Sequence, residues 1–401
     1  MYRLLWHEDG TFSYEREISM YHRSINAVHV EATDRCNAQC PVCIRSFQGG
    51  PEREQYVTNS ELGLKHFKKY LGGVFCANVE RWNFCGNKGD PASALELVDI
   101  FKYILEYNPE TIITMRTNGG ARNESFWESI GELFEDSNCR VIFAVDGLED
   151  TNHIYRKNVK WKNLLRNMKA YFNNGGFGLG WFDTLKFQHN EHQWEEIEHL
   201  AKSFGVWVNL KEPYGFANLP DGKLKTIPVY DRTLSDNNTY KLLYTIKPHT
   251  TKNYVEGDYQ PLRADIQDTS HPYYDYTNDE LFKYSHTEID CLVNQTRHDQ
   301  AEIFLDCDGS VYPCCFIGVR MTVGDMQLSS MVGDSDIVLS DSNSIVDILK
   351  SDYFQKTLPD GIEGNFTGDL TLGGKTNKCI TCVDCCGTGG TDMQLSHIEQ
   401  P

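Results

Sequence analysis

The sequence contains no run of apolar residues long enough to cross a membrane. A membrane-spanning helix needs about 20 consecutive apolar residues, and the opening stretch MYRLLWHEDG reaches His7, Glu8 and Asp9 before any apolar segment of useful length. A transmembrane helix and a secretory signal are therefore not expected. We expect a cytoplasmic protein with no membrane partner, in which cysteines stay reduced and clustered cysteines are metal ligands rather than disulfides.

Positive charge is also scarce. The chain has 38 Lys and Arg against 57 Asp and Glu, which gives a net charge of −19, and it contains no basic run the size of a binding patch. Such a surface repels the phosphates of nucleic acids, so we expect no nucleic-acid partner. What the chain does have is 401 residues with 40% hydrophobic and 12% aromatic side chains. This composition supports a sizeable core in one large domain or in two to three ordinary ones.

Short apolar runs alternate with helical patterns between residues 25 and 213. The runs are typical of strands, and the segments between them have apolar residues at helical spacing. The predicted strands begin at Ile25, Val79, Thr111, Cys139, Phe182 and Val206. Alternating strands and helices predict an α/β fold with a mostly parallel sheet and helices outside it. Six units are too few for a closed eight-fold barrel, so we predict an open, partial (β/α)6 TIM-like barrel.

The rest of the chain differs in composition. Residues 1–24 form a polar N-terminal lead-in, and residues 214–290 are rich in Tyr, Asp, Asn, Thr and Pro without clear periodicity. We interpret 214–290 as a bridging or substrate-covering segment. Residues 291–401 are predicted to form a small cysteine-rich domain, which holds Cys291, Cys307, Cys314, Cys315, Cys379, Cys382, Cys385 and Cys386.

The stretch TDRCNAQCPVC places Cys36, Cys40 and Cys43 on the loop after the first predicted strand. Three is an odd number for disulfides, and a structural zinc site would need a fourth Cys or His at short spacing. Three thiolates on one loop can bind three irons of a cubane [4Fe–4S] cluster and leave the fourth iron open. A zinc site and buried, unligated thiols are the alternatives.

This loop resembles that of the radical S-adenosylmethionine (SAM) enzymes. The resemblance covers about residues 25–212. GNKGDP after the second strand is similar to the family's Gly-Gly-Glu-Pro element, although Asp90 replaces Glu and Lys88 stands where a second Gly is usual. The resemblance implies a SAM-binding [4Fe–4S] cluster on the three cysteines, and a flavodoxin- or ferredoxin-type reductant. It also implies SAM contacts at Gly89, Asp90, Pro91, Thr117, Asn118, Asp146 and Asn190.

The second group of cysteines begins at Cys291. In DGSVYPC, a strand, a turn at Gly309 and a second strand would bring Cys314 into a hairpin pocket, and CITCVDCC follows far downstream. Four thiols gathered in this way suit a fully ligated [4Fe–4S] cluster. The arrangement resembles the SPASM/twitch extension of radical SAM enzymes. That resemblance favours one auxiliary cluster on Cys291, Cys314, Cys379 and Cys382.

Two alternatives to this auxiliary site stay open. Eight cysteines are enough for two auxiliary clusters, and a four-cysteine zinc ribbon accepts the same spacing. Three further cysteines lie in or near predicted apolar elements and are expected to pack in the core rather than bind metal. These are Cys76, Cys85 and Cys139.

The family resemblance implies an enzyme that generates a 5′-deoxyadenosyl radical and removes hydrogen from a peptide or small-molecule substrate. With an auxiliary cluster accepting an electron, the expected outcome is dehydrogenation or cross-linking. A redox-neutral radical SAM epimerase is one alternative. A non-catalytic iron–sulfur or zinc scaffold, or an electron carrier, is another.

Overall fold

A computed structural model describes residues 3–6, 12–15, 25–213, 216, 226–234, 240–250, 289, 301–322, 324–365 and 378–386. The chain divides into two compact units. We call one the barrel unit, which comprises Ala27–Gln267 and Leu305–Gly309. We call the other the cysteine-rich unit, which comprises Met1–Asn26, Asp268–Phe304 and Ser310–Pro401. The domain boundaries derived from composition remain predictions.

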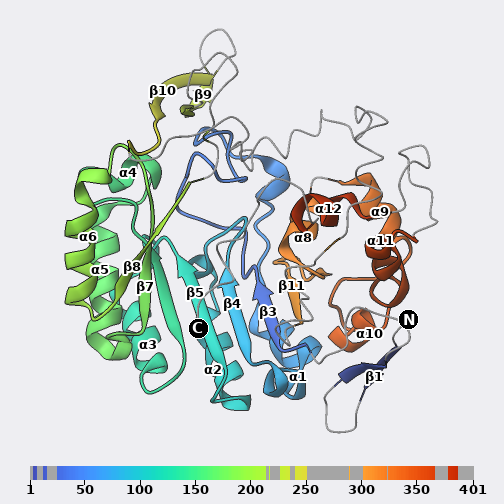
Figure 1. The fold of residues 1–401 in the computed structure, drawn as a ribbon. Coiled ribbons are helices and arrows are strands. Elements are labelled where there is room, and N and C mark those ends of the chain that lie inside the picture. The colour runs from blue at the N-terminus through green and yellow to red at the C-terminus, as the bar shows by residue number, and fades with distance from the viewer. Residues whose placement is uncertain are drawn as a thin grey trace. The chain divides into compact units, whose positions relative to one another are not determined.

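Six parallel strands form the centre of the barrel unit and are paired in chain order (Figure 1). They are β3 (Ala27–Val30), β4 (Arg81–Cys85), β5 (Ile112–Thr117), β6 (Arg140–Ala144), β7 (Gly180–Leu185) and β8 (Trp207–Lys211). Each strand falls within or beside a predicted apolar run. The prediction of an α/β fold with an open six-unit barrel is therefore confirmed.

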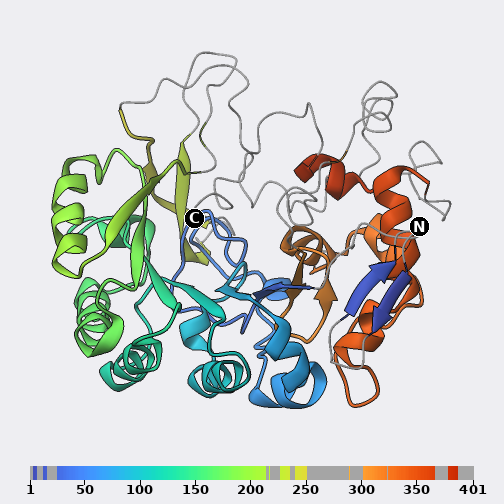
Figure 2. The same ribbon diagram turned by 60° about the horizontal axis from the view of Figure 1, so that its bottom comes forward.

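Helices connect successive strands and lie outside the sheet in an arc, as Figure 2 shows. The N-terminus of α3 is capped, because the Asn123 side chain accepts a hydrogen bond from the Phe126 N–H. The helices are α1 (Gly73–Asn78), α2 (Leu97–Tyr107), α3 (Glu124–Phe134), α4 (Asn152–Tyr155), α5 (Trp161–Tyr171) and α6 (Trp194–Ser203). Shorter helical segments are η1 (Glu54–Tyr56), η2 (His66–Leu71), η3 (Pro91–Ser93), η4 (Phe172–Gly176) and η5 (Glu191–Gln193).

The two faces of this sheet differ in chemistry because side chains alternate along a strand. On β4, Trp82 and Phe84 are fully buried, and the Phe84 ring lies 4.8 Å from the ring of Phe101 on α2. This face packs against the helices and forms the core. The intervening residues, such as Arg81 and Cys85, are only partly buried. We call the face that carries them the inner face.

A two-stranded antiparallel hairpin follows the parallel strands in the barrel unit. It consists of β9 (Ile227–Leu234) and β10 (Tyr240–Ile246), which lie in the segment predicted without periodicity. The hairpin packs beside the cysteine loop, since the ring of Phe47 lies 5.6 Å from that of Tyr230 and 5.2 Å from that of Tyr240. The composition of residues 214–290 did not predict this hairpin.

The cysteine-rich unit combines short strands with short helices. Its strands are β1 (Arg3–Trp6), β2 (Phe12–Glu15), β11 (Glu302–Leu305, whose last residue belongs to the barrel unit) and β12 (Val311–Tyr312). Its helices are α8 (Cys315–Thr322), α9 (Met326–Val332), α10 (Ile345–Leu349), η8 (Tyr353–Thr357), α11 (Leu358–Glu363) and α12 (Ile380–Cys386). The polar lead-in thus contains an antiparallel hairpin, β1–β2.

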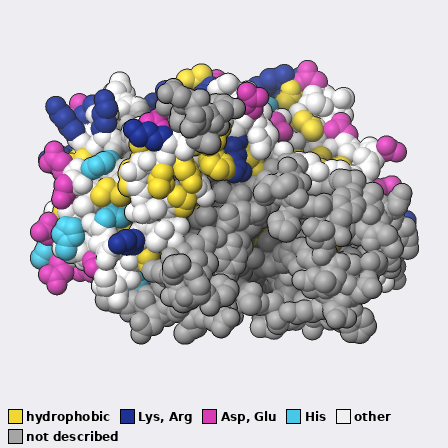
Figure 3. Space-filling view, turned by 90° about the horizontal axis from the view of Figure 1, so that it is seen from above, with side chains coloured by type: hydrophobic (Ala, Val, Ile, Leu, Met, Phe, Trp, Pro, Cys, Tyr) yellow, Lys and Arg dark blue, Asp and Glu magenta, His cyan; other side chains and the backbone are white. Residues whose placement is uncertain are grey.

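The described helices and the visible surface agree with the composition. None of the helices in the described ranges combines the length and the apolar character needed to span a membrane. On the face shown in Figure 3, acidic and basic side chains of the described residues are scattered among uncharged ones.

Candidate functional site

The cysteines of the first motif lie on the loop that follows β3, and their three thiols interact electrostatically with one another. Cys40 is buried, whereas Cys36 and Cys43 are partly exposed. The Cys43 N–H donates to the Cys40 carbonyl at 3.0 Å, which closes a turn between them. Burial raises the pKa of the Cys40 thiol to about 11 and that of Cys36 well above its ordinary value. The unligated thiols of Cys36 and Cys40 are therefore protonated, and metal binding must release their protons.

The three thiols suit a cluster better than a single metal ion. Among the described residues, no three His, Cys, Asp or Glu side chains are grouped closely enough to hold one ion. A cubane cluster makes a different demand, because each thiolate binds its own iron atom. Three thiols on one short loop meet that demand.

Two nitrogen donors reach the sulfur atoms. Asn118 Nδ2, just beyond β5, lies 3.5 Å from Cys36 Sγ. Arg156 Nη1, at the end of α4, lies 3.6 Å from Cys40 Sγ. Donors of this kind stabilise a thiolate and tune the potential of a bound cluster.

Arg156 is held in place by a buried carboxylate. Its Nε lies 2.5 Å from Asp146 Oδ2, and Asp146 is fully buried just beyond β6. The other carboxylate oxygen accepts from the Leu185 N–H at 2.6 Å. Asn190 Nδ2 donates to the carbonyls of Asp146 at 2.9 Å and Leu185 at 2.8 Å. Asn190 thus links the ends of β6 and β7 by hydrogen bonds.

Asp90 joins the loop after β4 to the end of β5. Its Oδ1 accepts from Thr117 Oγ1 at 2.8 Å and from the Ala92 N–H at 3.0 Å. Its Oδ2 accepts from the backbone N–H and from Nδ2 of Asn118, both at 2.7 Å. Burial raises the pKa of Asp90 despite these four hydrogen bonds. Its side chain is fully engaged inside the protein and braces two strand ends.

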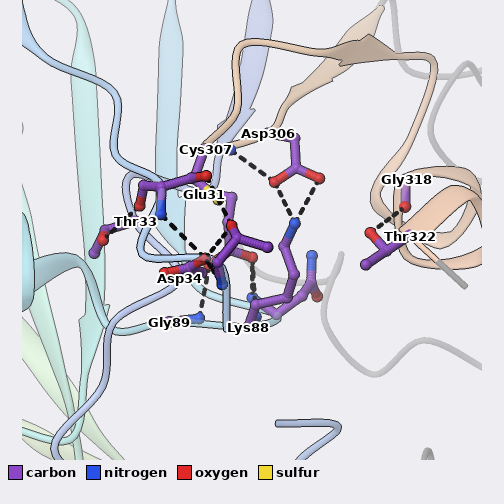
Figure 4. Close-up of polar contacts among 12 residues, drawn as sticks. Glu31, Thr33, Asp34, Lys88, Gly89, Asp306, Cys307, Gly318 and Thr322 are labelled. Carbon is purple, nitrogen blue, oxygen red and sulfur yellow. Dashed lines mark hydrogen bonds and ion pairs between the residues drawn. The ribbon is translucent and has the colours of Figure 1, made fainter. Parts of the chain in front are cut away.

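The GNKGDP loop wraps around the carboxylate of Glu31, as Figure 4 shows. Glu31 accepts hydrogen bonds from the backbone N–H groups of Asn87 at 2.5 Å, Lys88 at 3.0 Å and Gly89 at 2.9 Å. Gly89 has no room for a side chain, because a Cβ there would lie 1.8 Å from the Thr33 carbonyl oxygen. Burial raises the pKa of Glu31 to about 7.

A distant part of the chain completes this loop. Lys88 Nζ lies 2.6 Å from Asp306 Oδ1 and 2.8 Å from Oδ2, and both side chains are buried (Figure 4). The Glu31 N–H donates to the Leu305 carbonyl at 2.9 Å. Cys307 is buried in the same place, where the charge of Lys88 acts on its thiol. The segment Leu305–Gly309 is therefore an integral part of the barrel unit.

In the cysteine-rich unit, three of the four predicted auxiliary ligands act electrostatically on one side chain. The thiols of Cys314, Cys379 and Cys382 all act to raise the pKa of Tyr353, after the larger effect of its burial. The Tyr353 hydroxyl is buried and has no hydrogen-bond partner among the described residues. Cys291, the fourth predicted ligand, lies outside the described residues.

Local contacts fix these thiols. The predicted strand, turn and strand before Cys314 are confirmed: Gly309 has a φ of +91°, and its N–H donates across the turn at 2.9 Å. The Gln327 side chain binds the backbone on both sides of Cys379. Its Oε1 accepts from the Ile380 N–H, and its Nε2 donates to the Lys378 carbonyl, each at 2.8 Å. The Cys379 N–H also donates to the Gly361 carbonyl at 2.6 Å.

Comparison with known proteins gives one sequence relative and several similar folds. No protein-family model matches the chain. It is 23% identical over 209 residues to a GTP 3′,8-cyclase from Desulforamulus reducens, and the match covers 50% of this chain and 60% of that protein. Similar solved structures include Streptococcus suis SuiB, with 11% identity, coverage of 84% of this chain and 68% of SuiB, and a TM-score of 0.46. A second is anSMEcpe with bound AdoMet and a peptide, with 11% identity, coverage of 82% of this chain and 81% of that chain, and a TM-score of 0.42. A third is BtrN with AdoMet and 2-DOIA, with 13% identity, coverage of 84% of this chain and 88% of that chain, and a TM-score of 0.37.

The sequence relative supports the resemblance of the three-cysteine loop to that of the radical SAM enzymes. The cluster-binding role of TDRCNAQCPVC stays a prediction. The chain spans 60% of the length of the curated relative that it matches.

The predicted SAM contacts lie at the carboxyl edge of the parallel strands. The polar ones are buried and bonded to other protein groups, so they form a frame for the edge. Their role in binding SAM remains a prediction. The residues are Gly89, Asp90, Pro91, Thr117, Asn118, Asp146 and Asn190.

Some predictions missed or misplaced residues. Glu31 was not identified, although a carboxylate inside the apolar run VHVEA is a signal, because a buried charge needs dedicated partners. Cys76 and Cys139 are buried in the core, as predicted. Cys85 is instead partly exposed on the inner face. There burial raises the pKa of its thiol, but His29 and the charge of Arg116 lower it below the ordinary value.

Proposed function

We propose that the chain is a radical SAM enzyme that binds a [4Fe–4S] cluster through Cys36, Cys40 and Cys43 and binds SAM at the adjacent carboxyl edge. When bound, the cluster and SAM supply a 5′-deoxyadenosyl radical that removes hydrogen from a substrate carbon. One observation carries this proposal. The same edge of the sheet carries the three thiols, two N–H donors to their sulfur atoms, and the GNKGDP loop that the Glu31 carboxylate holds.

The role of Glu31 in this proposal is to shape the GNKGDP loop. Its carboxylate occupies three successive backbone N–H groups of the loop. The loop therefore offers a ligand carbonyl oxygens rather than N–H donors. Carbonyl oxygens accept hydrogen bonds from an ammonium group, which is the group that SAM presents.

Arg156 and Asn118 would orient the cysteine sulfurs. Asp146 holds the Arg156 guanidinium against Cys40, and Asp90 holds the Asn118 amide against Cys36. Because both carboxylates are buried, these donors keep their positions without help from water. The edge is thus organised before any ligand binds.

We extend the proposal to the cysteine-rich unit, where Cys291, Cys314, Cys379 and Cys382 would hold an auxiliary [4Fe–4S] cluster. The electrostatic effect of three of these thiols on the same residue, Tyr353, supports it. Four thiolates leave no iron open, so this site suits electron transfer rather than substrate binding. The proposed outcome is oxidative, either dehydrogenation or cross-linking, with a flavodoxin- or ferredoxin-type protein as the source of electrons.

The test is reductive cleavage of SAM. Anaerobically reconstituted protein is reduced with dithionite and given SAM, and 5′-deoxyadenosine is measured by chromatography. The wild-type chain is expected to form it, and the Cys36→Ala/Cys40→Ala/Cys43→Ala variant is expected to form none. A Cys76→Ala/Cys139→Ala variant removes two core thiols and is the control that keeps cleavage. Cleavage at the wild-type rate in the triple variant would sink the proposal.

A further inference from the structure

The inner face of the barrel sheet carries arginines on three adjacent strands. These arginines are partly buried and lie on the face of the sheet opposite the one that packs against the helices. They are Arg81 of β4, Arg116 of β5 and Arg140 of β6. Pairing places Arg140 opposite Thr114, two residues before Arg116, so these side chains share one face. In a chain with a net charge of −19, such a concentration of cations calls for a specific partner.

Arg116 and Arg140 are held close together. Their guanidinium groups lie 6.0 Å and 5.5 Å from the centre of the same ring, that of Trp181 on β7. Burial lowers the pKa of Arg140, and the positive charge of Arg116 lowers it further. The ring attracts both cations, but the two like charges repel each other, and a bound anion would relieve that repulsion.

The acidic side chain nearby is already neutralised. Asp183 accepts from Lys211 Nζ at 2.8 Å, Trp181 Nε1 at 2.9 Å and Asn209 Nδ2 at 3.1 Å. The Nε of Arg116 lies 4.0 Å from this carboxylate, at the limit of an ion pair. The charge of Asp183 is therefore matched mainly by Lys211.

The arginines themselves have neutral partners. Arg116 Nη1 donates to the amide oxygen of Asn83 at 2.6 Å, and Arg140 Nε donates to the hydroxyl of Thr114 at 3.3 Å. Arg81 Nη2 is buried and has no hydrogen-bond partner within the described ranges. Donor capacity thus remains on all three strands.

We infer that the inner face binds an oxyanion of the substrate, a carboxylate or a phosphate, through Arg116 and Arg140. A guanidinium fork matches both groups, because its parallel N–H donors can each meet one oxygen. The inference rests on the proposed function, in which a substrate carbon loses hydrogen at the carboxyl edge of the barrel strands. It adds the chemical class of that substrate.

The neighbouring tryptophans indicate what the rest of the substrate is like. The rings of Trp181 and Trp207 are stacked 5.2 Å apart, and Trp207 is 50% exposed. An exposed aromatic surface beside the arginines suits a flat or apolar group attached to the oxyanion. We therefore expect an organic anion rather than a small inorganic ion as the natural ligand.

The strand geometry relates this site to the cysteine edge. Arg116 precedes Asn118 by two residues, which is about 7 Å of strand, and Asn118 contacts Cys36. A substrate whose oxyanion binds Arg116 would have carbons a few bonds away near the strand ends. That is where the proposed chemistry takes place.

The experiment uses the reconstituted full chain, with inorganic phosphate and acetate as probes against chloride at constant ionic strength. Phenylglyoxal modification of individual arginines is followed by mass spectrometry. Either probe is expected to slow modification of Arg116 and Arg140 at least about five-fold, because a bidentate oxyanion covers the reactive nitrogens. Protection mapped on the wild-type chain does not depend on whether a variant folds.

A matched pair of variants sharpens the test. The tryptophan fluorescence response to the probe should be lost in Arg116→Gln/Arg140→Gln. It should be kept in Lys102→Gln/Lys202→Gln, which removes the same charge from exposed positions on α2 and α6. Protection by phosphate alone would indicate a phosphorylated substrate, and protection by acetate alone a carboxylate substrate.

Protection by neither probe overturns the inference. SAM cleavage without substrate is measured on the same samples, so the two proposals fail separately. Absence of cleavage in the wild-type chain contradicts the proposed function. Intact cleavage without oxyanion protection contradicts only the substrate class inferred here.

Discussion

The two groups of cysteines have different surroundings. The thiols of the first loop are contacted by Asn118 and Arg156, and both donors are anchored by buried carboxylates. Three thiols of the cysteine-rich unit act electrostatically on the buried hydroxyl of Tyr353. The first group is thus distinguished by donors that buried carboxylates hold in place.

This difference agrees with the division of labour proposed above for the two groups. A charged, hydrogen-bonded frame is needed where a polar ligand such as SAM must be oriented. A site for electron transfer needs ligands for every iron and an apolar, rigid surrounding. Removing buried charges from the barrel unit tests this difference.

The largest effect is expected from the Lys88–Asp306 ion pair, which is buried at distances of 2.6 and 2.8 Å. Asp306→Asn leaves Lys88 buried without its carboxylate and should lower the free energy of unfolding by about 3–5 kcal/mol. Urea denaturation under anaerobic conditions measures this change in the free energy of unfolding. The double variant Lys88→Met/Asp306→Asn should lose less than the sum of the two single losses.

The control for this pair is an exposed one. Lys202 and Glu198 on α6 lie 3.6 Å apart at the surface, and Glu198→Gln should change the free energy of unfolding by less than about 1 kcal/mol. Equal, small effects at both pairs would contradict the claim that Lys88–Asp306 holds the loop.

A smaller, pH-dependent effect is expected from Glu31. Its burial, followed by the charge of Asp306, raises its pKa from 4.5 to about 7. The folded state thus binds this proton more tightly than the unfolded state, so the stabilisation is complete below pH 4.5 and is lost as pH rises to about 7. Relative to Glu31→Gln, the wild-type free energy of unfolding should fall by about 3 kcal/mol across that window.

The measurement is urea denaturation of both proteins at pH 4.5, 5.5, 6.5 and 7.5, with circular dichroism to show that each is folded at the start. A difference that stays constant, or that rises with pH, would show that Glu31 is not the titrating group.

The sequence predicts the parts of the fold that depend on local pattern. Trp82 and Phe84 alternate with polar residues, as in a strand with one buried face, and Cys36, Cys40 and Cys43 are recognisable from their spacing. These features need only neighbouring residues. The six strands and the cysteine loop were therefore predictable.

The frame of the site was not predictable because its partners are distant in the chain. Glu31 lies 56 residues or more from the N–H groups that it binds, and Lys88 lies 218 residues from Asp306. Only folding brings such groups together. The β9–β10 hairpin was not predicted for another reason. Its residues lack the regular alternation of apolar and polar side chains by which a strand is recognised.

The most direct test of the division of labour isolates the barrel cluster in the Cys379→Ala/Cys382→Ala variant. Iron analysis should give about four irons per chain, against about eight in the wild-type chain. Electron paramagnetic resonance of the dithionite-reduced variant should show g values that shift when SAM is added, because SAM binds the open iron. The Cys36→Ala/Cys40→Ala/Cys43→Ala variant should give a spectrum that SAM leaves unchanged. A spectrum that SAM shifts in the triple variant, but not in the double variant, would contradict the assignment of the two cysteine groups.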